Sequence, residues 1–267
     1  MLLDLYLKKK LSSYQISKQL NCSQALVMKK LKLFRIPTRT IQQGKALTPP
    51  KYPRKDFCGS PEEKAYLLGF RYGDLYISKT HPDSPTIRAS TNSGKLEQLS
   101  LVRDLFCKYG HVKEIGPDKQ GAVNIRCYLN NSFSFLINKA GGVPKEILGK
   151  RNTALAFFAG YVDAEGTFSI NYRNQPVFSI KTQDKHTMAQ IQSKILPRIG
   201  VKTRLQFVRA AGSVKNGVKS NKDVYGVFVY NKRDLGKIIS NLLPYLKHEK
   251  RKGDALKVLT LINHVGT

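Results

Sequence analysis

Acidic residues are scarce in this sequence. Its 267 residues include 46 lysines and arginines but only 18 aspartates and glutamates, which gives a formal net charge of +28 at pH 7. The basic surplus is spread along the chain rather than confined to a tail. A charge of this sign and size predicts a polyanionic partner, and double-stranded DNA is the partner that we expect.

Long hydrophobic runs are also absent. The longest, Ala154 to Val162, has nine residues and is too short to span a membrane, and no signal peptide opens the chain. We therefore expect a soluble intracellular protein without a membrane partner, in the cytoplasm or nucleoid or in an organelle matrix. The hydrophobic content of 41% is enough for one large or two modest cores, which excludes a chain that is disordered as a whole.

Motifs for soft metals and for disulfides are missing as well. The four cysteines form no C-x-x-C pair and have no histidine at zinc-ligand spacing, so we interpret them as reduced thiols. The five histidines form neither an H-x-x-x-H nor a His-Asn-His arrangement. Structural or solvent-exposed roles are the interpretation that we favour for them.

What the sequence does contain is one nine-residue pattern that occurs twice, at residues 67–75 and again at residues 158–166. Each copy is apolar at its start, carries two small residues four positions apart, and has a carboxylate directly after the second small residue. The small residues are Gly69 and Gly73 in the first copy and Gly160 and Ala164 in the second. The carboxylates, Asp74 and Glu165, stand at matching places.

This pattern predicts two helices in backbone contact with their acids together. Small residues at i and i+4 form a smooth stripe along which two helices can approach closely. A carboxylate in the last turn of a helix faces the negative end of the helix dipole, which costs roughly 0.3–1 kcal/mol. If the stripes pack, Asp74 and Glu165 lie side by side, and a divalent cation would compensate their charges. We expect Mg²⁺, with Mn²⁺ as an alternative, because the ligands are oxygen atoms.

Both stretches resemble the signature helices of the LAGLIDADG homing endonucleases. One apolar motif with a single acid is typical of a buried core helix, but two copies 91 residues apart with their acids in register favour this family. The resemblance implies an α+β fold in which two pseudo-symmetric αββαββα repeats form a DNA-binding saddle. We expect the first repeat at residues 62–150 and the second at residues 151–267.

Alternating apolar and polar residues after each stretch indicate strands with one polar face. In the second half they run over residues 168–172, 178–183 and 202–206, followed by a loop at 210–223 and a strand at 224–230. In the first half they predict strands near 76, 87–91 and 122–129, with helices at 96–109 and from Phe133. Such faces are either simply solvated or bind DNA, and the net charge favours DNA. The basic residues that we expect to contact DNA there are Arg88, Arg126, Arg173, Lys181, Lys202 and Arg204.

The first 40 residues read as a small all-α domain that resembles the helix-turn-helix of resolvase-like DNA-binding proteins. Its third helix, 24–33, would enter a major groove, with Lys30 or Lys32 at phosphates. Gln24, Ala25, Met28 and Lys29 are the side chains that we expect at base edges. The alternative is a three-helix bundle for protein contacts. Residues 41–61 are basic and proline-rich, which predicts an extended linker that either follows DNA or only connects the domains.

Hydrolysis of a phosphodiester needs an activated water, neutralisation of the transition state and stabilisation of the leaving oxygen, all of which divalent metals supply. Asp74 and Glu165 are the only symmetrically placed acids, so we assign them as catalytic residues and metal ligands, and we interpret Asp163 as structural. The resemblance adds the carbonyls of Gly73 and Ala164 as metal ligands. It also implies catalytic roles for the two residues Gln183 and Lys250.

The match for Lys250 requires a one-residue insertion, and residues 247–252 could instead be a basic run that contacts phosphates. The function that we expect is that of a monomeric, site-specific endonuclease that cuts both DNA strands at a long target. The alternative is a catalytically inactive DNA- or RNA-binding relative that acts as an intron maturase or a transcription regulator. Arg71 and Tyr72, inside a normally apolar helix, keep that alternative open. A recombinase is excluded, because the extended catalytic domain of such enzymes is missing.

Overall fold

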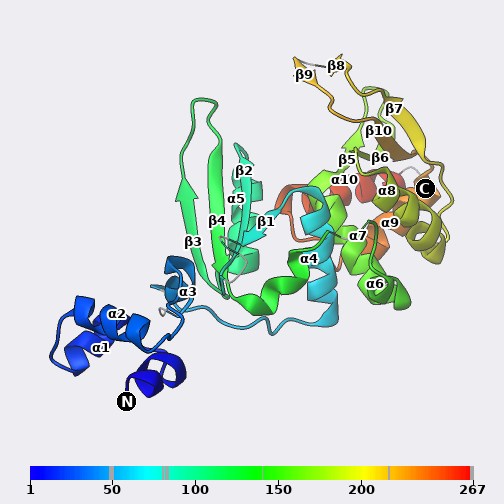
Figure 1. Cartoon of the computed structure of the whole chain (residues 1–267). Coiled ribbons are helices and arrows are strands. Elements are labelled where there is room, and N and C mark those ends of the chain that lie inside the picture. Colours follow the sequence, from blue (N-terminus) through cyan, green and yellow to red (C-terminus); the bar gives the residue numbers. More distant parts are fainter. Residues whose placement is uncertain (48–50, 80, 82–83, 140, 216, 265–267) are drawn as a thin grey trace. The chain divides into compact units, whose positions relative to one another are not determined.

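The structure is a computed structural model that describes residues 1–47, 51–79, 81, 84–139, 141–215 and 217–264 (Figure 1). The chain divides into two compact units, which are described separately. The first unit is Met1–Pro53 with Lys79–Thr86, and the second is Arg54–Ser78 with Ile87–Thr267. In the described part of the chain, no helix combines the length and the apolar character needed to cross a membrane.

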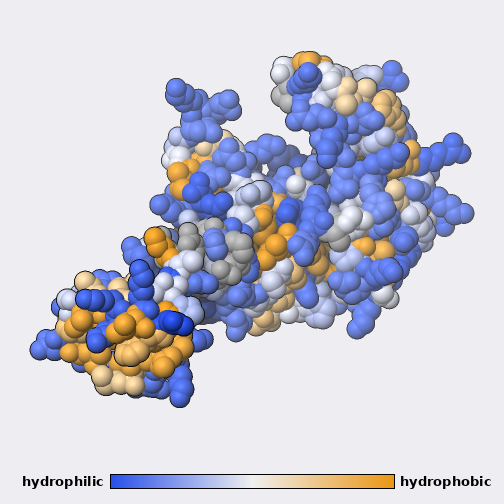
Figure 2. Space-filling model, viewed as in Figure 1, coloured by the Kyte–Doolittle hydropathy of each residue, from blue (hydrophilic) through white to orange (hydrophobic). Residues whose placement is uncertain are grey.

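The N-terminal unit is a small helical bundle with a core of its own. Its elements are the π-helix η1 (Asp4–Lys8) and the α-helices α1 (Ser13–Gln19), α2 (Gln24–Leu33) and α3 (Ile41–Ala46). Ser12 and Ser23 cap α1 and α2 through their hydroxyl groups, as the sequence predicts. The buried side chains are Leu5, Tyr6, Ile16, Val27, Leu31 and Ile36. Figure 2 shows further hydrophobic side chains on the surface of these helices.

Helix α3 corrects the expectation that residues 41–61 are extended throughout. The backbone amide of Thr40 donates to Oε1 of Gln43 at 2.9 Å, and the Gln43 amide donates to Oγ1 of Thr40 at 3.2 Å. This reciprocal pair is a capping box, which satisfies two amides at the start of a helix. The prediction was wrong for Ile41–Ala46, while Pro49 and Pro50 lie outside the described residues.

The first repeat of the second unit follows the predicted order of elements. Its elements are α4 (Pro61–Gly73), β1 (Tyr76–Lys79), β2 (Ile87–Ser93), α5 (Leu96–Phe106), β3 (His111–Ile115), β4 (Val123–Leu129) and the 3₁₀-helix η2 (Asn131–Leu136). The strands form a sheet in the order β1-β2-β4-β3, in which β2 and β3 both pair antiparallel with β4. The helix predicted from Phe133 is therefore a short 3₁₀-helix, and the Asn130 side chain caps it.

The second repeat has the same plan with more helical elements. Its elements are α6 (Lys145–Gly149), α7 (Arg151–Glu165), β5 (Gly166–Ile170), β6 (Pro176–Thr182), α8 (Lys185–Gln190), η3 (Ile191–Ile195), η4 (Leu196–Ile199), β7 (Gln206–Arg209), β8 (Val214–Lys215), β9 (Val218–Lys219), β10 (Val224–Val229), α9 (Lys232–Leu242) and α10 (Glu249–His264). The main sheet has the order β5-β6-β10-β7. The structure differs from the prediction in two places: the strand expected from residue 202 begins at Gln206, and the expected loop contains the hairpin β8-β9.

Helices α4 and α7 form the centre of this unit and lie side by side in Figure 1. A Cβ atom on Gly69 would overlap the carbonyl oxygen of Phe157 and lie 3.0 Å from the Tyr161 amide nitrogen. A Cβ on Gly160 would overlap the carbonyl oxygen of Tyr66. Because each glycine faces the backbone of the other helix, the prediction that the two small-residue stripes pack on each other is confirmed.

Burial explains why α7 carries so few polar residues. Every residue from Thr153 to Ala164 is buried, because α4 covers one side of the helix and the second sheet and α9 cover others. Asp163 is the only acidic or basic residue in that stretch. Phe178 and Ile180 of β6 face the same core, whereas Lys181 between Ile180 and Thr182 is exposed. The fold is thus the expected α+β arrangement of two antiparallel sheets around a helix pair.

The segment that joins the repeats is bound to both of them. Nζ of Lys139 donates to the carbonyl oxygen of Tyr72 at 2.7 Å and lies 3.5 Å from Oδ2 of Asp184. The Val143 amide donates to Oε1 of Gln190 at 2.7 Å. The joining segment therefore holds α4 of the first repeat and α8 of the second.

Candidate functional site

The two predicted acids lie at the adjoining ends of α4 and α7. Asp74 is the residue that follows the last helical residue of α4, and Glu165 is the last residue of α7. Gly73 sits at the contact between the helices, since a Cβ there would overlap the Cβ of Ala164 and lie 3.0 Å from Cγ of Glu165. The packing of the stripes thus brings the two carboxylates side by side.

Burial and mutual repulsion disfavour the charged forms of these acids. Burial, and after it the charge of Asp74, raise the pKa of Glu165 to about 7, although Lys139 and Arg251 oppose the shift. Burial also raises the pKa of Asp74. That shift is opposed by Arg251, by Lys95, and by the Gln98 side chain, whose Nε2 donates to Oδ2 of Asp74 at 2.8 Å. Both pKa values are raised in spite of these neighbours, so the nearby cations compensate the two acids only in part.

The donor set fits a hard divalent cation. All candidate ligand atoms are oxygens. The charge of Asp74 raises the pKa of Glu165, and a cation between two such carboxylates would stabilise their charged forms. The carbonyls of Gly73 and Ala164 belong to the last turns of their helices, where carbonyl groups have no partner within the helix. Among the residues that the structure describes, no group of three or more His, Cys, Asp or Glu could hold a metal ion. The remaining positions around a cation here would thus be filled by water or phosphate oxygens.

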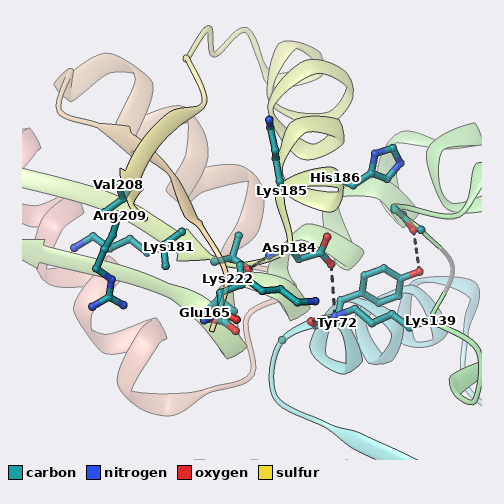
Figure 3. Close-up of a pocket in the computed structure, with 16 residues that line it drawn as sticks. Tyr72, Lys139, Glu165, Lys181, Asp184, Lys185, His186, Val208, Arg209 and Lys222 are labelled. Atoms are coloured by element: carbon teal, nitrogen blue, oxygen red, sulfur yellow. Dashed lines mark hydrogen bonds and ion pairs between the residues drawn. The ribbon is translucent and has the colours of Figure 1, made fainter. Parts of the chain in front are cut away.

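Two cavities flank the acid pair, one beside each acid. The cavity beside Glu165 has a volume of about 960 Å³ and contains Lys139, Lys181, Gln183, Arg209 and Lys222 in its lining. Figure 3 shows these side chains together with the ion pair of Lys139 and Asp184. The cavity beside Asp74 has a volume of about 260 Å³, and Lys95, Gln98, His248, Lys250 and Arg251 are part of its lining. Both cavities are lined by more cationic than anionic side chains, which suits a bound phosphate group.

Sequence reasoning missed Lys139 as a residue of the site. It follows the 3₁₀-helix η2, it lines the cavity that contains Glu165, and it opposes the raised pKa of that acid. The sequence did contain a signal for it. Lys139 stands in the first repeat at a place that corresponds to the basic run after Leu246 in the second repeat. Because η2 is much shorter than α9, counting residues between the repeats does not align the two segments.

Arg251 was missed as well, although its neighbour was predicted. Arg251 opposes the raised pKa values of both Asp74 and Glu165, so its charge acts on the acid pair. The predicted residue Lys250 lines the cavity beside Asp74, but its Nζ lies 2.6 Å from Oδ2 of Asp254, one helical turn further along. The charge that acts on the acids in this segment is thus that of Arg251, one residue after Lys250, whose catalytic role stays a prediction.

Gln183 lies where the sequence places it, just after β6 and in the lining of the cavity beside Glu165. Its side chain is exposed, and Nε2 donates to Oγ of Ser220 at 3.4 Å, which is a long hydrogen bond. Thr91, its predicted counterpart, lines the cavity beside Asp74. Both positions therefore lie near the acids.

The predicted basic residues of the sheets occupy two different settings. Arg88 and Arg126 are half-buried on adjacent strands, where Arg126 lies opposite Ser90 and its Nε donates to Oδ1 of Asn124 at 2.6 Å. The other four are exposed on β6, on the turn after β5 and on the segment before β7; they are Lys181, Arg173, Lys202 and Arg204. Arg173 also lies over the ring of Tyr172, which is 89% exposed.

The predicted recognition residues of the N-terminal unit all lie on α2 or at its start. Gln24, Ala25, Met28 and Lys29 are exposed, whereas Val27 and Leu31 are buried in the bundle. The Gln24 side chain donates from Nε2 to Oγ of Ser13 at 2.9 Å. The helix thus has the inner face that the sequence predicts and an outer face with basic residues.

The two unusual residues of the first signature helix make bonds to the backbone. Arg71 donates to the carbonyl oxygens of Leu75, at 2.7 Å, and Leu136, at 3.2 Å. The Tyr72 hydroxyl donates to the carbonyl oxygen of Gly142 at 2.8 Å. These bonds explain how a polar side chain and a phenol are accommodated beside the acid pair without disturbing the helix contact.

A family model described as a LAGLIDADG-like domain matches residues 152–242. The matched segment extends from the start of α7 to the last residue of α9 and so contains Glu165 and the whole second sheet. A comparison with curated proteins finds no match.

Solved structures with a similar fold include the homing endonuclease I-WcaI bound to its DNA recognition sequence, at 13% identity and a TM-score of 0.50, over 72% of this chain and 86% of that one. I-DmoI in complex with DNA and Mn is 19% identical with a TM-score of 0.47, over 68% of this chain and 96% of that one. WhiA from Thermatoga maritima is 14% identical with a TM-score of 0.48, over 76% and 61% of the two chains. The match of the family model and the shared fold confirm the resemblance to LAGLIDADG homing endonucleases.

Proposed function

We propose that this chain is a divalent-metal-dependent endonuclease that cuts both strands of a long DNA site. The observation that carries the proposal is the contact of α4 and α7, which brings Asp74 and Glu165 together. A pair of buried, mutually repelling carboxylates lowers the stability of the fold unless a cation compensates the two charges. Such a cost is expected at a functional site, here one that binds a cation next to DNA. The net charge of +28 supports DNA as the partner.

Asp74 and Glu165 hold the metal, together with the carbonyl oxygens of Gly73 and Ala164. A bound Mg²⁺ or Mn²⁺ would supply an activated water and neutralise charge that develops on the phosphate. The cationic side chains of Lys139 and Arg251 face the acid pair from opposite repeats and stabilise negative charge beside it. Gln183 orients solvent at the cavity beside Glu165, and Lys250 contacts a phosphate from its exposed position.

The two sheets bind the DNA. Arg88 and Arg126 on the first sheet, and the four exposed basic residues of the second repeat defined above, contact phosphates and base edges. The chain acts as a monomer, because the two repeats already supply both acids. The N-terminal unit adds a second contact, with α2 in a major groove and Gln24 and Lys29 at base edges.

The experiment that tests this function is a cleavage assay on a DNA library with randomised sites. The purified chain should cut both strands of a subset of sites with Mg²⁺ or Mn²⁺ present and cut none in EDTA. Binding to a recovered site should weaken steeply with salt, by roughly 10³–10⁵-fold between 50 and 200 mM if six to ten phosphates are contacted. Deletion of residues 1–40 should reduce the steepness and leave cleavage intact.

The competing function is DNA or RNA binding without catalysis, as in a maturase or a transcription regulator. It is motivated by Arg71 and Tyr72, which depart from the family pattern in the first signature helix. A chain that selects sites from the library, cuts none with either metal and retains tight binding would establish this second function. A chain that neither binds nor cuts DNA would refute both.

A further inference from the structure

Asp163 joins three elements of the site through a single oxygen atom. The residue is completely buried, two positions before Glu165 on α7. Its Oδ2 accepts hydrogen bonds from the Tyr66 hydroxyl at 2.6 Å, from the Lys247 amide at 2.7 Å and from the His248 amide at 3.1 Å. One carboxylate thus connects α7 to α4 and to the segment that leads into α10.

The two amides belong to the start of α10. The carbonyl oxygen of His248 accepts from the Lys252 amide at 2.9 Å, so His248 is the residue that opens the first turn of this helix. A carboxylate beside the first amides of a helix satisfies donors that have no partner within the helix and complements the helix dipole. Asp163 therefore links the first turn of α10 to α7.

That first turn carries Arg251. Arg251 lines the smaller cavity together with Asp74, Ala164 and His248. Among the residues that the structure describes, its buried Nε atom has no hydrogen-bond partner, and neither has Oδ1 of Asp163. Because no hydrogen bond fixes the guanidinium through Nε, the backbone of the first turn has the larger part in placing it.

The two repeats differ at this position. The counterpart of Asp163 in the first repeat is Tyr72, whose hydroxyl is bonded to the carbonyl oxygen of Gly142. Lys139, which precedes Gly142 by three residues, lines the cavity beside Glu165, whereas Arg251 lines the cavity beside Asp74. Each of these cations therefore lines the cavity on one side of the acid pair.

We propose that Asp163 is a positioning residue that holds Arg251 on the Asp74 side of the site and thereby sets the cleavage rate of one of the two DNA strands. It acts through the amides of Lys247 and His248, not by contact with the DNA. The inference rests on the proposed endonuclease function and deepens it, since it assigns different supports to the two strand cleavages.

The test measures the cleavage rate of each strand separately, on a duplex that carries a recovered target site with one strand labelled at a time. Arg251→Gln identifies the strand that depends on Arg251. Asp163→Ala should slow that same strand by about 10- to 100-fold relative to the other, as expected for a displacement of about 1 Å in a reacting group's surroundings. Asp163→Asn keeps an oxygen that can accept from both amides and should restore most of the ratio.

A double substitution shows whether the two residues act together. If Asp163 acts through Arg251, the variant Asp163→Ala with Arg251→Gln should cut the affected strand no more slowly than Arg251→Gln alone. The matched control is Thr153→Val, at the other end of α7, which removes a buried hydrogen bond of 2.8 Å to the carbonyl oxygen of Ile147. It should lower the melting temperature and leave the ratio of the two strand rates unchanged.

The outcomes separate this inference from the proposed function. A parent chain that cuts neither strand refutes the endonuclease, and the positioning role with it. A parent that cuts, with Asp163→Ala slowing both strands equally or slowing the strand that Arg251→Gln spares, overturns the positioning role alone. If Asp163→Ala does not fold, Tyr66→Phe removes one of the three donors; it should slow the same strand by a smaller factor, and an unchanged ratio there would overturn the inference.

Discussion

The two signature helices make the same contact and carry the same kind of acid, but their last turns differ. In α7 the residues of the last turn before Glu165 are buried and apolar apart from Asp163, whereas α4 has Arg71 and Tyr72 at the corresponding place. The polar residues of α4 bond to carbonyl groups of their own repeat and of the joining segment. The difference shows that the helix contact requires only the small-residue stripe and the terminal acid in both helices. The other residues of the last turns hold each helix against its own surroundings.

Substitution of Asp74 or Glu165, which stand at equivalent positions of the two helices, should have the largest effect on cleavage. Asp74→Asn and Glu165→Gln should each lower cleavage by more than about 10²–10³-fold, because each removes a charge that acts in the transition state. DNA binding should stay within a few-fold of the parent or tighten, since each change removes a negative charge near phosphates. Gel-shift and cleavage assays on one target measure both, and full cleavage by either variant would break the equivalence.

The helix contact should tolerate no side chain at its centre. Gly160→Leu should destabilise the protein by about 3 kcal/mol or more, because even a Cβ overlaps the carbonyl oxygen of Tyr66. Gly236→Ala in α9 is the matched control: a Cβ there meets no atom within 4 Å, and alanine should stabilise the helix by roughly 0.5–1 kcal/mol. Urea denaturation measures both, and a Gly160→Leu protein as stable as the parent would refute the backbone contact.

The acids should differ in their effect on stability as pH changes. Glu165 has an ordinary pKa of 4.5 and a folded value of about 7, so between these pH values the folded chain keeps a proton that the unfolded chain has lost. The free energy of unfolding of the metal-free protein should therefore fall as pH rises through this window, by about 3 kcal/mol from this group.

Glu165→Gln cannot lose a proton, so it should flatten this part of the stability profile and make the metal-free protein more stable than the parent at pH 8. Asp74→Asn should flatten it less, because hydrogen bonding by Gln98 and the charges of Arg251 and Lys95 oppose the shift of Asp74. Denaturant titrations in EDTA at several pH values measure the slopes. Equal slopes for the parent and Glu165→Gln would contradict the raised pKa.

The smallest effect is expected for the hydrogen bond of Tyr72, the residue that stands in the first repeat where the second has Asp163. Tyr72→Phe leaves the carbonyl of Gly142 without the phenol's hydrogen bond in a buried place and should cost about 1–2 kcal/mol. Tyr161→Phe, which loses a bond of 3.1 Å to Oγ1 of Thr182, provides the comparison within α7. Thermal melts of both variants will show whether the joining segment depends on Tyr72, and no change for Tyr72→Phe would show that it does not.

The centre of the fold was predictable because its signals are local. The spacing of Gly69, Gly73 and Gly160 alone indicates a backbone contact, and the contact then brings the acids together. The order of strands followed from alternation. Helix α3 was missed although its signal was present: Thr40 and Gln43 have the spacing of a capping box, but the nearby prolines and the lack of apolar periodicity dominated the interpretation.

The cations of the site were harder to predict. Whether Lys250 or Arg251 acts on the acids depends on how α10 is turned about its axis, and the segment that leads into α10 is hydrogen-bonded to Asp163, more than 80 residues earlier in the chain. Lys139 reaches the acids only because the joining segment docks on both repeats. These contacts connect residues far apart in sequence, and neither periodicity nor spacing encodes them.

The docking of that joining segment has a consequence for how the second unit comes apart. Lys139 links α4 to Asp184, Val143 is bonded to Gln190, and the Arg198 guanidinium donates to the carbonyl oxygen of Leu148 at 2.5 Å. The chain between the two copies is thus part of both and not a free tether. Although the unit is built of two repeats, neither repeat can unfold without exposing surface of the other. The two repeats should therefore unfold in one cooperative transition with one heat-absorption peak.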